Sequence, residues 1–227
     1  MLLSFEGLDF CGKSTQIRLL ESWMNSRGDG RAVLCVREPG GTHISERVRD
    51  VLLDPRHEEM SEVAELFLFS AARAQLVRQL IIPALQHGEN VVCDRYHDST
   101  TAYQGYGRGI DIETITRINQ LATAGVMPDA TVYLDITPKE SYRRRALRLN
   151  LGTADAPEAR SPEDDRMEQS GIAFYARVRE GYLAIARAEP ERFHVIDGTQ
   201  TVESIAEEIR AVVSALNLRI EKAGKNT

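Results

Sequence analysis

Short apolar runs alternate along the chain with longer segments that have a helical pattern. The short runs predict strands at 2–6, 32–36, 90–94, 130–135 and 193–197. The longer segments predict helices at about 13–26, 43–53, 60–87, 111–124, 138–149, 170–188 and 202–217. Strands that are apolar on both faces and alternate with helices are typical of a parallel sheet that is covered on both sides. We therefore expect an α/β fold.

The pattern also indicates how the chain is divided. It has no internal repeat and no Pro/Gly/Ser-rich linker, so we expect one domain over residues 1–227. The segment 150–169, "NLGTADAPEARSPEDDRMEQ", is polar, contains two prolines and is interpreted as a mobile excursion. We expect the tail after Leu218 to be frayed.

Composition narrows the class of protein. The net charge of −6 argues against general nucleic-acid binding, because phosphate backbones attract basic surfaces. Glu6 interrupts the apolar start, and no later run approaches the roughly 20 apolar residues that cross a bilayer, so we expect neither a signal peptide nor a membrane span. Three cysteines without metal-ligand spacing suggest a reducing compartment, and we expect the cytoplasm.

The most specific motif is "GLDFCGKS", which follows the first predicted strand and opens the first predicted helix. It matches the phosphate-loop pattern G-x4-G-K-[ST]. Glycines in such a loop let backbone N–H groups turn toward an anion at a helix N-terminus. Lys13 would reach the β- and γ-phosphates of a nucleotide, and Ser14 would bind Mg²⁺. The expected ATP-binding residues are Gly7, Leu8, Asp9, Phe10, Cys11, Gly12, Lys13, Ser14 and Thr15.

The third predicted strand ends in Asp94, within "VVCDRY". A carboxylate there can lie beside the metal or its water shell, although strands also end in Asp for reasons of turn geometry. A switch GTPase is a rival interpretation of the phosphate loop. However, the guanine-reading Asn-Lys-x-Asp motif is absent after the fourth strand. A small nucleotide kinase would also need an acceptor pocket and cations for two polyanions.

Three further motifs could supply that pocket. "REPGGT" places Arg37 at the carboxyl end of a strand, where open α/β folds bind ligands; an ordinary turn is the alternative. In "FLFSAARAQ", Phe69 and Arg73 share a helix face. The Phe69 ring could stack on a base, or it could simply pack in the core. "DRYHDSTTAYQGYGRG" supplies Arg95, which could bind a phosphate with Arg37. It also supplies four polar residues that could read a base edge or a sugar, or could simply form a hydroxyl-rich loop: Ser99, Thr100, Tyr103 and Gln104.

In this order, "FEGLDFCGKST", "REPGGT", "FSAARAQ", "DRYHDSTTAYQG" and "DRMEQ" strongly resemble bacterial thymidylate kinases over about residues 2–200. The resemblance implies a five-stranded parallel sheet, a lid at about 150–169, a homodimer, and phosphorylation of dTMP by Mg²⁺ and ATP. It also implies metal contacts from Ser14, Asp94 and Glu168. The implied dTMP-binding residues are Asp9, Arg37, Pro39, Phe69, Arg73, Arg95, Ser99, Thr100, Tyr103 and Gln104. Among these, Phe69 would stack on thymine, Arg73 would contact its carbonyl, and Tyr103 would occupy the place of a ribose 2′-hydroxyl.

Phe10 departs from the family pattern. Some members carry an arginine at this position, and others carry glycine together with basic residues in the lid. Because Phe10 supplies no charge, this chain should belong to the second kind. Arg144, Arg148, Arg160 and Arg166 are the candidates for the missing charge; Arg148 and Arg160 are preferred, and a solvated basic face at 143–145 is the alternative. The expected catalytic residues are thus Lys13, Arg37, Arg95, Arg148 and Arg160.

Overall fold

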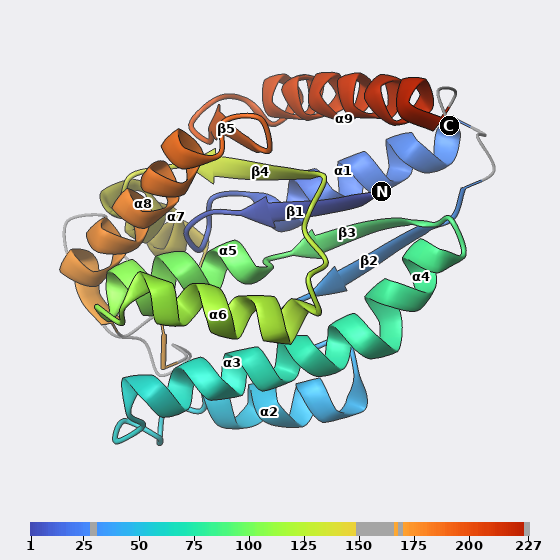
Figure 1. The fold of residues 1–227 in the computed structure, drawn as a ribbon. Coiled ribbons are helices and arrows are strands. Elements are labelled where there is room, and N and C mark those ends of the chain that lie inside the picture. The colour runs from blue at the N-terminus through green and yellow to red at the C-terminus, as the bar shows by residue number, and fades with distance from the viewer. Residues whose placement is uncertain (28–30, 149–165, 168–169, 225–227) are drawn as a thin grey trace.

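Five parallel strands form the centre of the computed structural model, which describes residues 1–27, 31–148, 166–167 and 170–224 (Figure 1). The strands are β1 (Leu2–Glu6), β2 (Val33–Arg37), β3 (Asn90–Asp94), β4 (Ala130–Asp135) and β5 (Phe193–Asp197). They lie in the order β2-β3-β1-β4-β5, and every neighbouring pair is parallel. The five-stranded parallel sheet is confirmed. The strand predicted at 32–36 is shifted by one residue, so Arg37 occupies its last position.

Helices cover both faces of this sheet. They are α1 (Lys13–Ser26), α2 (His43–Leu53), α3 (Glu62–Leu76), α4 (Ile82–Gln86), α5 (His97–Thr100), α6 (Ile112–Thr123), α7 (Pro138–Arg148), α8 (Gly171–Ala188) and α9 (Val202–Gly224). In Figure 1, α1 and α9 lie on one side of the sheet, and α3, α4 and α6 lie on the other. No helix in the described part of the chain is long and apolar enough to cross a membrane.

Local capping chemistry fixes where several helices begin. The side chains of Thr42, Ser61 and Asp111 each accept a hydrogen bond from the backbone N–H three residues later, at the starts of α2, α3 and α6. Such a bond satisfies one of the N–H groups that an α-helix leaves without a partner.

The structure differs from the sequence prediction in three helical regions. The helix predicted at 60–87 is divided into α3, a π-helical turn η1 (Val77–Ile81) and α4; Pro83, which has no N–H to donate, lies in the first turn of α4. The stretch after β3 is α5 followed by a second π-helical segment, η2 (Thr101–Gly107), rather than a loop. The tail that is expected to fray after Leu218 is helical as far as Gly224, where α9 ends.

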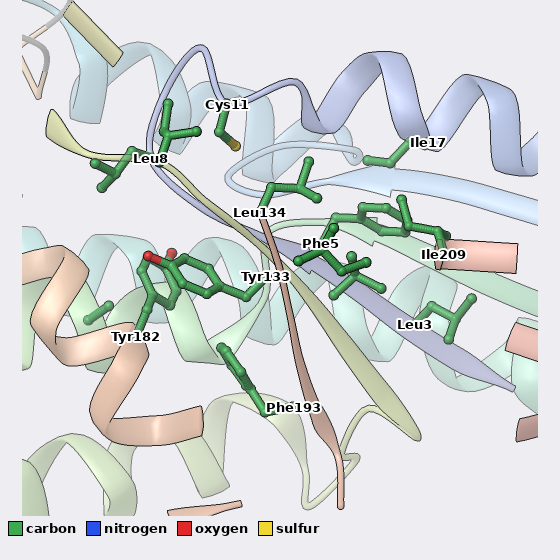
Figure 2. Close-up of a cluster of buried hydrophobic side chains, with 14 of the residues drawn as sticks. Leu3, Phe5, Leu8, Cys11, Ile17, Tyr133, Leu134, Tyr182, Phe193 and Ile209 are labelled. Atoms are coloured by element: carbon green, nitrogen blue, oxygen red, sulfur yellow. The ribbon is translucent and has the colours of Figure 1, made fainter. Parts of the chain in front are cut away.

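The larger part of the core joins the sheet to α1, α8 and α9 (Figure 2). Tyr133 of β4 stacks on Tyr182 of α8 with ring centroids 4.8 Å apart, and Phe193 of β5 packs against both. Leu8 and Cys11 belong to the same cluster although they come from the loop after β1. The loop is therefore anchored in the core at two points, which holds its backbone at the carboxyl edge of the sheet.

Candidate functional site

The loop between β1 and α1 has the backbone of a phosphate cradle. Gly7 (φ 143°) and Gly12 (φ 107°) both lie in the left-handed region that favours glycine. Lys13 donates from Nζ to the carbonyl oxygens of Gly7 at 3.2 Å and Leu8 at 3.1 Å, so its ammonium group folds back over the loop. Because Leu8 and Cys11 are buried in the core, only their backbone atoms can face an anion.

We expect Gly7→Ala to cost about 3 kcal/mol of folding free energy, from backbone strain together with overpacking. A Cβ at this position would lie 2.7 Å from the backbone oxygen of Leu134 on β4. Gly88→Ala is the matched control, because Gly88 also has a positive φ but a Cβ there would meet no atom within 4 Å. Urea unfolding measures both free energies, and equal losses for the two variants would contradict the steric argument.

A cavity lies over this cradle and opens to solvent, and it measures about 1170 Å³ together with the solvent at its opening. It gathers cations from five parts of the described chain. Its cationic lining residues are Lys13, Arg37, Arg49, Arg95, Arg144 and Arg148. Asp9, Phe10, Gly12, Ser14, Thr15, Glu38 and Asp94 complete its walls. Of the five predicted catalytic residues, four line this cavity, and the fifth, Arg160, lies outside the described residues.

Arg37 and Arg95 differ in how firmly they are held. Arg37 is half exposed and pairs with Glu46 at 2.9 Å, a surface pair of small net strength that a phosphate could displace. Arg95 is largely buried, bonds Asp9 at 2.7 Å and lies near the hydroxyls of Ser99 and Tyr182. Burial alone would raise the pKa of Asp9, but Arg95 and Lys13 outweigh it and hold that pKa below its ordinary value.

Two oxygen donors meet at the mouth of the cradle. The hydroxyl of Ser14 donates to the carboxylate of Asp94 at 3.1 Å, which brings the N-terminus of α1 against the end of β3. A hydroxyl and a carboxylate suit Mg²⁺, which usually takes one or two protein oxygens and completes its shell with water and phosphate. Glu168, the third predicted metal contact, lies outside the described residues.

A second cavity, also open, adjoins the first and measures about 590 Å³ together with the solvent at its opening. It is lined by Asp9, Glu38, Pro39, Arg49, Leu53, Phe69, Arg73, Arg95, Ser99, Thr100, Tyr103, Gln104 and Met167. All the residues expected to contact the acceptor therefore lie at this cavity except Arg37, which lines the neighbouring one. Phe69 is partly buried against the core and also contributes to this wall, so packing and binding are compatible.

Arg73 forms the floor of the second cavity and is almost fully buried. Its Nε donates to Glu38 at 2.6 Å, Nη1 to Thr100 and Asn119, and Nη2 to the carbonyl of Tyr96. A guanidinium has five N–H donors, so these four bonds leave one for a ligand. A fixed single donor in a buried wall is suited to a base carbonyl.

Tyr103 and Gln104 complete the wall from η2. The guanidinium of Arg95 lies 5.0 Å from the Tyr103 ring centroid, in a cation–π arrangement. Burial raises the pKa of Tyr103, so its phenol stays protonated. Gln104 donates to Glu65 at 2.8 Å, which fixes its amide.

Glu38 is a site residue that the sequence analysis did not identify. It lines both cavities, and Arg73 is its ion-pair partner. Burial raises its pKa to about 7, against the lowering effect of Arg73.

This pKa predicts a pH-dependent stability. Since the pKa of Glu38 is higher in the folded chain than its ordinary value, its contribution is fully present below about pH 4.5 and is lost as pH rises to about 7. Relative to Glu38→Gln, the wild-type chain should lose about 3 kcal/mol of folding free energy across that window. Urea unfolding of both chains at pH 4.5, 6 and 8 measures the difference; a constant difference would contradict the shift.

Arg49 and Arg144 also contribute to the lining of the phosphate cavity, to a greater extent than the sequence indicated. Arg49 lines both cavities and donates to the carbonyl of Pro39 at 2.9 Å. The sequence gives only a weak signal for Arg49, which is that it lies one helical turn after Glu46. Arg144 was a candidate but not a preferred one, and it bonds the carbonyls of Cys11 and Gly198. Most of the segment expected to be a lid lies outside the described residues.

The two cavities are continuous in their lining. Asp9, Glu38, Arg49 and Arg95 belong to both. A ligand whose ring lay against Phe69 could therefore extend an anionic group toward Lys13. The arrangement suits two phosphorylated molecules bound end to end.

Comparisons with known proteins agree with this geometry. The family model described as thymidylate kinase matches residues 5–209. Thymidylate kinases of Chlorobaculum parvum and Thermoanaerobacter sp. are 46% and 43% identical, covering 96% and 93% of this chain and 97% and 96% of their own lengths. The crystal structure of thymidylate kinase from Ehrlichia chaffeensis has a TM-score of 0.72 and 32% identity, covering 94% of this chain and 98% of that one.

Proposed function

Because the chain belongs to the thymidylate kinase family, we propose that it transfers the γ-phosphoryl group of ATP to dTMP, giving dTDP and ADP. The observation that carries this proposal is the junction of the two cavities, whose shared walls include Asp9 and Arg95. ATP would bind at the cradle, and dTMP would place its base against Phe69 and its phosphate at the junction.

The reaction needs charge neutralisation more than a general base. A phosphate monoester with a second pKa near 6 is mostly a dianion at neutral pH, so its oxygen is already nucleophilic. That oxygen attacks the γ-phosphorus, and the bond from this phosphorus to the β,γ-bridging oxygen breaks as ADP leaves. Lys13, Arg37 and Arg95, together with Arg148 and Arg160, would offset the repulsion between the two anions and align them.

Magnesium would assist at the mouth of the cradle. Ser14 and Asp94 would hold it directly or through water, and Glu168 would lie nearby. When bound, the ion supplies charge stabilisation to the phosphate oxygens.

Recognition of the acceptor would be divided among the walls of the second cavity. Phe69 would stack on thymine, Arg73 would donate to its carbonyl, and Pro39, Ser99, Thr100 and Gln104 would surround the ring. Tyr103 would exclude a ribose 2′-hydroxyl, and Asp9 would approach the sugar 3′-hydroxyl.

We also propose one domain with a lid at about 150–169, working in the cytoplasm as a homodimer. The three cysteines are all free thiols, which fits a reducing compartment. Apolar side chains are exposed on α3 and on the two helices that pack against it, α2 and α6. They are Ile44, Val51, Val63, Phe67, Ile112 and Leu121. A surface of this kind supports self-association.

Light scattering after size exclusion tests the dimer. The wild-type chain should elute with twice the monomer mass, and Phe67→Glu should elute as a monomer. Leu218→Glu, a similar change at an exposed residue on α9, should remain a dimer. A monomeric wild type would exclude this part of the proposal.

ADP release from Mg-ATP tests the activity, with dTMP, dUMP, dCMP, dAMP, dGMP and the ribose counterpart of dTMP as separate acceptors. We expect strong stimulation by dTMP, weaker stimulation by dUMP and negligible stimulation by the others. Stimulation by another monophosphate would keep the kinase but overturn the base assignment. With no stimulation by any acceptor, the phosphate-loop switch would become the better interpretation.

A further inference from the structure

Phe10 has an unusual backbone and an unusual place. Its φ of 62° puts a residue other than glycine in the left-handed region, at a point of the cradle where the side chain reaches the phosphate cavity. The ring is neither buried in the core, as Leu8 and Cys11 are, nor fully exposed. In a cation-lined cavity, the open face of such a ring can accept a cation.

That partner comes from α7, which contacts three successive residues of the cradle along one helical face. Ser141 donates to the carbonyl of Asp9 at 2.7 Å, and Arg144 donates to the carbonyl of Cys11 at 3.4 Å. One turn further, the guanidinium carbon of Arg148 lies 5.9 Å from the centroid of the Phe10 ring.

The two arginines of this face are held differently. Arg144 also bonds Glu140 at 2.6 Å and the carbonyl of Gly198 at 2.8 Å, so the protein holds each of its three side-chain nitrogens. Arg148 has no hydrogen bond or ion pair with any described residue, and its cation lies over the face of the Phe10 ring. A ring face attracts a cation without using its N–H donors, which therefore stay available for an anion.

We propose that Phe10 is a positioning residue that holds the guanidinium of Arg148 over the phosphate cavity. An uncharged residue of the cradle thus places a cation from α7 beside the transferring phosphoryl group. The inference rests on the proposed function. It explains how a cradle with no arginine of its own keeps the Arg148 guanidinium in the cavity that Lys13 also lines.

A double-mutant cycle on the full chain tests the coupling. Phe10→Leu removes the ring but keeps a non-glycine residue at the same φ, so backbone strain stays comparable. With dTMP and Mg-ATP we expect Phe10→Leu to lower kcat by about 2- to 30-fold, with a smaller change in the KM for ATP. In an Arg148→Met background the same substitution should change kcat by less than about 2-fold. Phe10→Tyr, which keeps the ring, should keep the dependence on Arg148.

The matched control is a cycle between Phe10→Leu and Arg143→Met. Arg143 lies on α7 but pairs with Glu140 and does not line the cavity, so the two effects should multiply. Thermal unfolding of each variant confirms that it is folded.

The inference is overturned if Phe10→Leu leaves kcat unchanged, if its effect is as large without Arg148 as with it, or if Arg148→Met alone has no effect. None of these three results affects turnover of dTMP by the wild-type chain, so they would refute the pairing of Phe10 with Arg148 and not the proposed function. Absence of dTMP-dependent turnover in the wild type would instead refute the proposed function, and this inference with it.

Discussion

Lys13→Met should lower kcat for dTMP phosphorylation by about 10³-fold while leaving the fold intact. The Lys13 ammonium is fixed by two loop carbonyls and faces the cavity, so it is in place before the charge on the phosphates develops. Losing one such preorganised donor costs about 10²–10³ in rate, and Lys13 also supplies a full positive charge. Steady-state ADP release at saturating dTMP measures the change.

Lys139→Met is the matched control for this prediction. Lys139 is an exposed lysine on α7 and does not line the phosphate cavity, so the same change of side chain should leave kcat within about 2-fold. Retention of more than a tenth of wild-type kcat by Lys13→Met, with both variants folded, would contradict the role of Lys13.

Arg73→Met should have the largest effect on stability, a loss of about 3–5 kcal/mol of folding free energy at pH 8. Arg73 and Glu38 are both buried and pair at 2.6 Å. Removing one partner leaves the other charge in a place with little solvent, and that desolvation is the main cost. At pH 8, above the pKa of Glu38 in the wild-type chain, the variant must either bury this carboxylate without a counter-charge or protonate it against the pH of the solvent. Urea unfolding measures the loss.

The double variant Arg73→Met/Glu38→Met separates charge from packing. Two apolar side chains of similar length remove both buried charges, so most of the lost stability should return. Binding of dTMP, measured by calorimetry, should not return, because the donor for the base carbonyl is absent. If the double variant is as unstable as Arg73→Met, packing or the bonds to Thr100 and Asn119 would outweigh the ion pair.

The sequence predicted the sheet because its strands are short, largely apolar runs, and the three central strands, β3, β1 and β4, are buried on both faces. β1 shows this plainly, with all five residues buried. Pattern was a poorer guide to helices around η1 and η2. A π-helical turn adds one residue to a helical turn, and because the segment is short, the resulting shift in the apolar pattern is hard to distinguish in the sequence.

Site residues were predictable where a local motif carries the chemistry. Lys13 and Ser14 follow from the glycine spacing of the cradle, and Arg37 from its strand end. Glu38 could not be found in this way, because its importance depends on Arg73, 35 residues away along the chain. The contact of Phe10 with Arg148 likewise joins distant segments and depends on how α7 is packed against the cradle.

The burial of Cys11 has a practical consequence for studying motion. Its thiol lies within the cradle but is only 1% exposed, so a thiol reagent can reach it only when the loop opens. Burial raises the pKa of Cys35 to about 11 and also raises that of Cys93, so neither thiol should compete strongly for reagent at neutral pH. The rate of labelling at Cys11 would therefore report how often the loop opens. A bound nucleotide should slow that labelling, and a nucleotide that stabilises the loop more strongly should slow it more.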